Sequence, residues 1–279
     1  MGELLERDDD LGALSAAVDE AAGGRGSMVL VGGEAGIGKT SLLRGLRERI
    51  DASVTFLVGA CEPLSVPVPL GPWREIVEAA TGRDLADAGT DDRIVLAREA
   101  AKALEQRAPA VAAIEDVHWA DPLTLDLLRL LARRVEQMDA VIVVTFREGE
   151  VASNPALGSL LGDLAGASAV RRIAPRALSA GAVHELAVSS GLDPVELARL
   201  TGGNPFLVME AVSAGDHLPV SVRDAVLARA ASEGGGPRRG PRPDRRPDQT
   251  VVEAGGVPVT CIGGSVSGSA GRYRTDPEA

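Results

Sequence analysis

The feature that most constrains this chain is a glycine-rich loop between an apolar run and a helical repeat. The apolar run is "SMVLVGG" at 27–33, and "KTSLLRGLRERI" at 39–50 has leucine and isoleucine at helical spacing. The loop fits the pattern G-x-x-x-x-G-K-[ST], in which backbone N–H groups surround a phosphate, lysine neutralises its oxygens and the hydroxyl reaches Mg²⁺. We therefore predict a nucleotide-phosphate site formed by Gly33, Glu34, Ala35, Gly36, Ile37, Gly38, Lys39, Thr40 and Ser41.

Further strand-like runs alternate with helical segments along the first two thirds of the chain. The runs lie at 54–60, 110–116, 140–146 and 168–173, and the clearest intervening helical segments lie at 91–107 and 122–136. This alternation is typical of a parallel sheet with helices on both faces. We predict an α/β fold of the P-loop NTPase type, with a parallel sheet of about five strands covered by helices.

From Leu178 onward the pattern changes to short helices separated by glycine and proline. The helical segments are "AGAVHELAVSSG", "DPVELARLTG", "NPFLVMEAVSAG" and "SVRDAVLARAA". They predict a small all-α lid domain. The expected organisation is a nucleotide-binding α/β domain at 1–176, a helical lid domain at 177–231 and a tail at 232–279.

The composition of the tail differs from that of the rest of the chain. Residues 233–279 contain ten glycines, six prolines and no leucine, too little apolar surface to offset chain entropy. We predict a disordered tail and assign it no function. Three interpretations stay open: a flexible functional tail, an arginine-rich arm for nucleic acid, or the product of a reading-frame shift, since GC-rich codons read out of frame yield glycine, proline and arginine.

Charge and cysteine usage exclude several classes of function. The formal net charge is −11; the tail's seven arginines and six acids give 7 − 6 = +1, so the remaining chain carries −11 − 1 = −12. An acidic body argues against a nucleic-acid groove. Cys61 and Cys261 lack metal or disulfide spacing, and neither a signal peptide nor a membrane span is recognisable. We expect a cytoplasmic protein with no membrane partner.

Two carboxylates follow the apolar run at 110–114. Glu115 and Asp116 would lie at the end of a strand, where one acid can hold Mg²⁺ together with Thr40 and the other can orient the attacking water. Which acid does which is left open. Because another strand precedes this one after the glycine-rich loop, the order suits the branch of P-loop proteins that has an inserted strand and a second catalytic acid.

Arg147 ends the next strand-like run, "VIVVTFRE". Ligands of open α/β sheets collect at the carboxyl ends of the strands. Arg147 is therefore a candidate to contact a γ-phosphate, and the alternative is an ordinary surface arginine.

Several segments in a fixed order carry a resemblance to a known family. They are "LLERDDDLGAL", "VGGEAGIGKTSLL", "IEDVHWADPLTLDLL", "VVTFRE" and "LTGGNPFLVMEAV". Over residues 1 to about 231 they resemble the ATPase module of signal-transduction ATPases with numerous domains (STAND), and most of all the large ATP-binding LuxR-type transcription regulators.

The resemblance implies roles that spacing alone does not. Arg7 matches an arginine that lies against the nucleotide base, although Glu6 stands where glycine is usual. Arg147 matches a γ-phosphate sensor, and Gly203, Asn204 and Pro205 match a Gly-x-Pro motif whose proline contacts the adenine side. In such proteins ADP holds the lid closed and exchange for ATP opens the molecule.

Two departures from the family matter. The family often has Asp-Asp or Asp-Glu where this chain has Glu115-Asp116, so a shorter acid would orient the attacking water. A displacement of that carboxylate by about 1 Å can cost on the order of a hundredfold in rate, so we expect slow hydrolysis. Relatives continue with a sensor array and a helix-turn-helix, which this sequence lacks, so direct DNA binding by this chain is not expected.

The leading hypothesis is an ATP/ADP-binding regulatory switch module with weak ATP hydrolysis, using Mg²⁺ and open to self-association or protein partners. One alternative is a competent AAA-type ATP hydrolase that works as an oligomer. A P-loop phosphotransferase and a non-functional truncated fragment are the others.

Overall fold

The computed structural model of this protein describes residues 4–188, 190–214 and 222. All of them fall within one compact unit, Met1–Gly234. The predicted tail at 232–279 and, apart from Val222, the predicted lid helix at 221–231 lie outside the described residues. The disorder of the tail and the three-part division of the chain therefore stay predictions.

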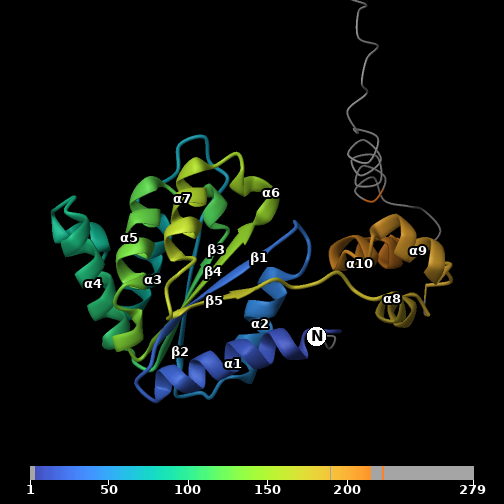
Figure 1. The fold of residues 1–279 in the computed structure, drawn as a ribbon, viewed down its shortest axis with the longest axis horizontal. Helices are drawn as coiled ribbons and strands as arrows, with labels where there is room; N and C mark the ends of the chain where they lie inside the picture. The colour runs from blue at the N-terminus through green and yellow to red at the C-terminus, as the bar shows by residue number, and fades with distance from the viewer. Residues whose placement is uncertain (1–3, 189, 215–221, 223–279) are drawn as a thin grey trace, which may run out of the picture. The chain divides into compact units, whose positions relative to one another are not determined.

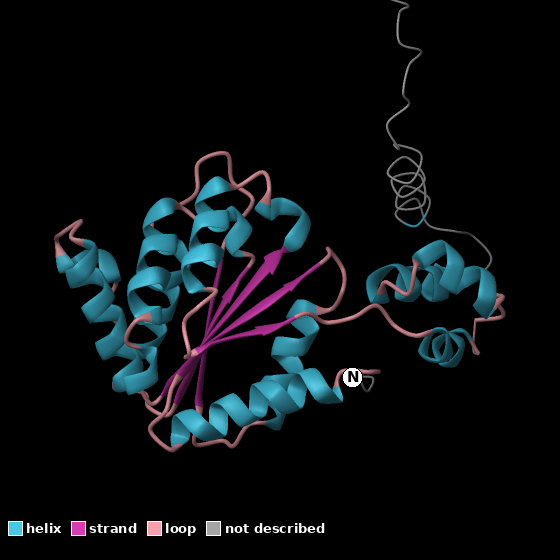
Figure 2. Cartoon of the chain, in the orientation of Figure 1, coloured by secondary structure: helices cyan, strands magenta, loops and turns pink. Residues whose placement is uncertain are grey.

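A five-stranded parallel sheet forms the centre of the α/β part (Figure 1, Figure 2). Its spatial order is β2-β3-β4-β1-β5, which confirms the predicted fold class. Strand β4 lies between β1, which leads into the glycine-rich loop, and β3, which ends at Glu115, whereas β2, the strand expected at 54–60, lies at the edge of the sheet. The strands are β1 (Ser27–Gly33), β2 (Thr55–Ala60), β3 (Ala110–Glu115), β4 (Ala140–Arg147) and β5 (Val170–Ile173).

Helices cover both faces of the sheet, as Figure 1 shows. Alternate side chains of β1 point to opposite faces: Met28 and Leu30 join the core under α3, α4, α5 and α7, while Val29 and Val31 join the core against α1 and α2. The first face is covered by α3 (Gly71–Thr81), α4 (Arg93–Glu105), α5 (Pro122–Ala132) and α7 (Pro155–Leu164), and the second by α1 (Asp8–Ala22) and α2 (Lys39–Arg49).

Short elements connect these layers. They are η1 (Leu85–Ala88), η2 (Val117–Trp119), η3 (Val135–Gln137) and α6 (Glu148–Val151). Helix α1, which the sequence analysis did not name, begins with three aspartates in its first turn, where negative charge stabilises the helix dipole.

Among the described residues, three helices follow the sheet and share a core of their own. They are α8 (Ala180–Ala187), α9 (Pro194–Thr201) and α10 (Pro205–Ala214), and Val183, Leu197 and Val208 are buried among them. Asp193 caps α9 and Asn204 caps α10, each directly before a proline at the first helical position. We call these three helices the lid.

Among the described residues, no helix combines the length and the apolar character needed to cross a bilayer.

Candidate functional site

The glycine-rich loop connects β1 to α2 through two backbone positions that require glycine. Gly36 has φ +76° and Gly38 has φ +102°, in the left-handed region that L side chains rarely adopt. Gly38 directly precedes α2, and a glycine cannot cap a helix with its side chain. The first-turn N–H groups of α2 are therefore left for an anion, and the helix dipole favours negative charge there.

Lys39 reaches back across this loop. Its side chain is largely buried, and Nζ donates hydrogen bonds to the carbonyl oxygens of Gly33 (3.0 Å) and Glu34 (2.8 Å). Burial lowers the pKa of Lys39, while the nearby carboxylate of Asp116 opposes that shift. The ammonium group is thus held against the start of the loop, and Lys39 lines the cavity described below.

The two acids after β3 face different partners. Glu115 Oε2 accepts a hydrogen bond of 2.6 Å from Thr40 Oγ1, which joins β3 to the start of α2. Asp116 adopts a left-handed conformation (φ +57°), and its backbone N–H donates to Thr145 Oγ1 at 3.0 Å. Asp116 also lines the same cavity as Lys39 and Arg147. The turn after β3 therefore separates an acid that contacts Thr40 from one that faces the cavity.

Arg147 ends β4 beside the glycine-rich loop. Its Cα pairs with that of Gly33 in the parallel register of β1 and β4. The guanidinium carbon lies 4.8 Å from the centroid of the Trp119 ring, and the side chain lines the cavity. Arg147 is thus a cation at the carboxyl edge of the sheet.

His118 packs behind the two acids. Its side chain is fully buried, its Nδ1 lies 3.7 Å from Asp116 Oδ1, and its ring centroid lies 4.4 Å from that of Trp119. Burial lowers the pKa of His118, which favours the neutral imidazole. Among the described residues neither ring nitrogen has a hydrogen-bond partner.

Arg7 ties the N-terminal segment to the loop. Its side chain is buried, and Nη2 donates to the carbonyl oxygens of Ile37 (3.0 Å) and Arg176 (2.8 Å). Glu6 has φ +54°, the conformation for which glycine is the usual choice, and its carboxylate accepts hydrogen bonds from Ser179 at the start of α8. This segment therefore bridges the glycine-rich loop and the lid.

The lid contacts the glycine-rich loop through two hydrogen bonds. Asn204 Nδ2 donates to the carbonyl oxygen of Ala35 (2.8 Å), and the backbone N–H of Phe206 donates to that of Gly36 (3.2 Å). Pro205 lies between these two residues and lines the cavity. The first turn of α10 is thus fixed directly to the loop.

These parts enclose one cavity of about 570 Å³, within the range of small-molecule sites. All the site residues predicted from the sequence line it except Gly33, Glu34 and Glu115. Gly33 and Glu34 instead accept the Lys39 hydrogen bonds, and Glu115 contacts Thr40. The sequence analysis did not name the apolar lining residues Leu4, Leu5, Leu178, Leu186, Phe206 and Met209.

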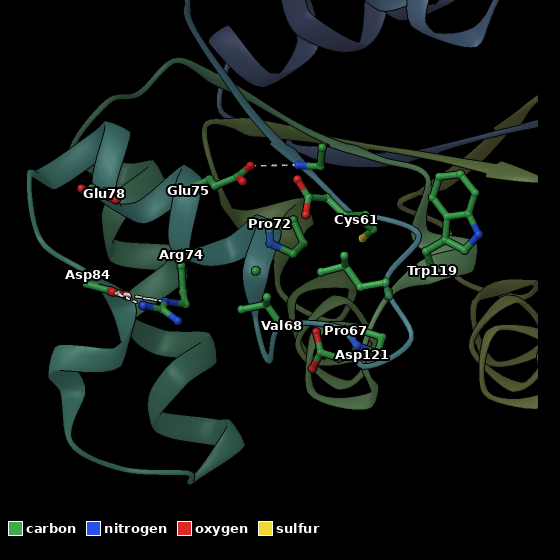
Figure 3. A pocket seen from close by; sticks show the side chains of 15 residues that line it. Cys61, Pro67, Val68, Pro72, Arg74, Glu75, Glu78, Asp84, Trp119 and Asp121 are labelled. Atoms are coloured by element: carbon green, nitrogen blue, oxygen red, sulfur yellow. Dashed lines mark hydrogen bonds and ion pairs between the residues drawn. The ribbon is translucent and has the colours of Figure 1, made fainter.

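A second, smaller pocket of about 270 Å³ lies at the end of β2 (Figure 3). Three of its charged side chains have partners: Arg74 pairs with Asp84, and Glu75 accepts the Ala60 N–H at 3.0 Å. Burial raises the pKa of the Cys61 thiol to about 12, so this thiol stays neutral. Trp119 is on the rim of the pocket. The glycine-rich loop does not contribute to it.

The sheet order, the glycine-rich loop on β1 and the acids on β3 define a P-loop NTPase fold. Residues 3–144 match the family model described as AAA ATPase domain. This chain therefore belongs to the AAA ATPase domain family, for which nucleotide binding is expected.

Two individual proteins also resemble this chain. The chain is 29% identical over 191 residues to an uncharacterized protein of Rhizobium meliloti (strain 1021), a match that covers 52% of this chain and 19% of that protein. A STAND protein with a tetratricopeptide repeat sensor from Pyrococcus horikoshii superimposes with a TM-score of 0.51 at 18% identity, covering 82% of this chain and 33% of the other. The second likeness shows the fold. The chain spans less than a fifth of the curated relative's length and a third of the STAND structure.

Proposed function

We propose that this chain is an ATP/ADP-binding switch module that hydrolyses ATP slowly, and that it acts like the ATPase part of LuxR-type regulators. The observation that carries the proposal is the single cavity bounded by both the glycine-rich loop and the lid. Because Asn204 donates to the Ala35 carbonyl oxygen and Phe206 of α10 donates to that of Gly36, a change in the loop would alter the lid contact directly.

The residues present fit a magnesium nucleotide. Mg²⁺ is usually held by one or two protein oxygens together with phosphates and water. The Thr40 hydroxyl and the Glu115 carboxylate lie 2.6 Å apart and would supply those oxygens. Among the described residues no group of three or more His, Cys, Asp or Glu could hold a metal by itself, which suits a metal shared with phosphates. When bound, Mg²⁺ neutralises charge on phosphate oxygens.

The same geometry supports an assignment of the two acids. Glu115 is engaged with Thr40 and takes the metal side. Asp116 lines the cavity with Lys39 and takes the role of orienting and deprotonating the attacking water. Its short side chain is the reason to expect slow turnover.

The switch follows from the different contacts of ADP and ATP. Arg147 would contact the γ-phosphate, which ADP lacks, while Pro205, Phe206 and Met209 would cover the base in both cases. A ligand shifts a conformational equilibrium only by its difference in affinity for the two states. The Arg147 contact supplies that difference in this proposal.

Limited proteolysis tests the switch. Arg176, an exposed residue between β5 and α8, offers a trypsin site next to the lid. We expect cleavage after Arg176 to be slower with Mg·ADP than with a non-hydrolysable ATP analogue. Equal protection by the two nucleotides would contradict a switch.

Two further measurements accompany the proteolysis. Chromatography of the supernatant after denaturation should identify retained ADP. Turnover near or above about 1 s⁻¹ that rises with protein concentration would favour an oligomeric ATP hydrolase instead.

A further inference from the structure

We propose that Trp119 is a positioning residue that holds the Arg147 guanidinium in the nucleotide cavity and thereby sets the preference for ATP over ADP. This inference rests on the proposed function above. It assigns a role to a tryptophan that lies three residues after Asp116 and whose ring approaches an arginine on a different strand.

The Arg147 backbone is fixed, but its side chain has few restraints. Strand pairing with Gly33 places its Cα beside the glycine-rich loop. Within the part of the chain that the structure describes, the guanidinium makes no hydrogen bond or ion pair, and its carbon lies 4.8 Å from the centroid of the Trp119 ring. A long arginine side chain without such a partner would sample many rotamers.

Trp119 is itself held firmly. Its backbone N–H donates to the Asp116 carbonyl oxygen (3.0 Å), and Asn154 Nδ2 donates to the neighbouring His118 carbonyl oxygen (3.0 Å). The Asp116 N–H is bonded to Thr145 of β4, and the His118 ring packs against the indole. The ring therefore keeps a fixed place relative to both Asp116 and the strand that carries Arg147.

An aromatic ring suits this task better than a carboxylate would. A carboxylate would occupy guanidinium N–H groups and neutralise the charge, both of which a phosphate needs. The face of an indole attracts the cation while leaving all five N–H donors free. Trp119 can thus restrict the arginine without competing with the γ-phosphate.

The alternative is that Trp119 only fills space at the rim of the second pocket (Figure 3). A space-filling residue would affect folding or the binding of both nucleotides, whereas a positioning residue for Arg147 affects only nucleotides that carry a γ-phosphate. The two interpretations therefore differ in the ratio of ATP to ADP affinity.

The test is calorimetric titration of the full chain with Mg·ADP and with the Mg²⁺ complex of a non-hydrolysable ATP analogue. We expect Trp119→Leu to weaken the analogue about tenfold and to leave ADP within about twofold of wild type. Trp119→Phe should restore most of the loss. In an Arg147→Met background, Trp119→Leu should change nothing further.

The outcomes separate the two claims. Wild-type protein that binds neither nucleotide overturns the proposed function and this inference with it. Wild-type binding combined with an unchanged affinity ratio in Trp119→Leu, or with additive effects of the two substitutions, overturns the role of Trp119 alone. Should the leucine variant fail to fold, Trp119→Met replaces it as a second side chain without an aromatic face, and an affinity ratio equal to that of wild type overturns the role.

Discussion

The two ends of the nucleotide cavity are built in different ways. The phosphate end lies at the carboxyl edge of the sheet. Lys39 begins α2, Asp116 follows β3 and Arg147 ends β4, and all three line the cavity. The other end comes from the N-terminal segment and the lid, and its lining is mostly apolar: Leu4, Leu5, Leu178, Leu186, Pro205, Phe206 and Met209.

Under the proposed function the two ends recognise different parts of the nucleotide. Charge and backbone N–H groups would bind phosphate at one end, and the apolar surface would cover the base at the other. The two ends are joined by the Asn204 and Phe206 hydrogen bonds to the loop. Substitutions at the phosphate end should therefore affect hydrolysis and phosphate recognition. Substitutions at the junction, where Asn204 and Phe206 contact the loop, should affect the part of the ADP affinity that comes from the base.

The largest effect is expected from removing the acid that faces the cavity. Asp116→Asn keeps the shape of the side chain but cannot accept a proton, so ATP turnover should fall by about a hundredfold or more. ADP affinity should stay near that of wild type. Single-turnover hydrolysis and calorimetry measure the two quantities.

Asp91→Asn is a suitable control for that variant, because Asp91 is an exposed carboxylate that does not line the cavity. Its turnover should match that of wild type. Comparable losses in the Asp116 and Asp91 variants would mean that general charge, and not Asp116, governs hydrolysis.

Removing the loop lysine should reduce affinity next most strongly. Lys39→Ala deletes a charged donor over the loop, so the affinity for ADP and ATP should fall by about 30- to 100-fold, as expected for a hydrogen bond to a charged group. Lys102→Ala is the matched control, since Lys102 is the chain's other lysine and is exposed on α4. Equilibrium titration should show no change in affinity for Lys102→Ala. An unchanged affinity in Lys39→Ala would contradict phosphate binding by the glycine-rich loop.

The junction can be broken by adding one methyl group. A Cβ on Gly36 would lie 2.7 Å from Phe206 Cβ and 2.9 Å from Asn204 Oδ1, at a backbone conformation unfavourable for alanine. Gly36→Ala should therefore disturb the contact between the loop and the lid and weaken ADP binding by about tenfold, which corresponds to about 1.4 kcal/mol. Gly82→Ala is the control: its φ is +74° with nothing within 4 Å, so it introduces the same backbone strain away from the lid. Equal ADP affinities in these two variants would show that the lid contact is unimportant.

A smaller effect is expected from the junction side chain. Asn204→Ala removes the bond to the Ala35 carbonyl oxygen and the cap of α10, so ADP should weaken by about 3- to 10-fold. Inorganic pyrophosphate, which has no base, should bind with unchanged affinity. Asp193→Ala removes the cap of α9 without touching the loop and should leave ADP binding unaltered.

The difference between the two ends also explains how much could be predicted from the sequence. The five strands and the glycine-rich loop were predictable because their signals are local: an apolar run, a fixed spacing of glycines and a helical repeat lie within a few residues of one another. The placement of Glu115 and Asp116 at a strand end followed from the same local pattern.

The base end could not be predicted in this way. The proximity of Arg7 and Pro205 to the site was available only from a family resemblance. The contact between Asn204 and Ala35 joins residues far apart in the chain, and no periodic pattern encodes it. In the sequence Leu4 and Leu5 are ordinary apolar residues, and only the structure shows that they line the cavity. The stacking of Arg147 on Trp119 likewise depends on two strand ends meeting in space.

The most direct test of the central claim is a comparison of Mg·ADP and Mg·pyrophosphate by calorimetric titration of the wild-type chain. If one cavity holds both phosphate and base, ADP should bind in the micromolar range and pyrophosphate at least about a hundredfold more weakly. Equal affinities, or no ADP binding at millimolar concentration, would contradict a site shared by the glycine-rich loop and the lid.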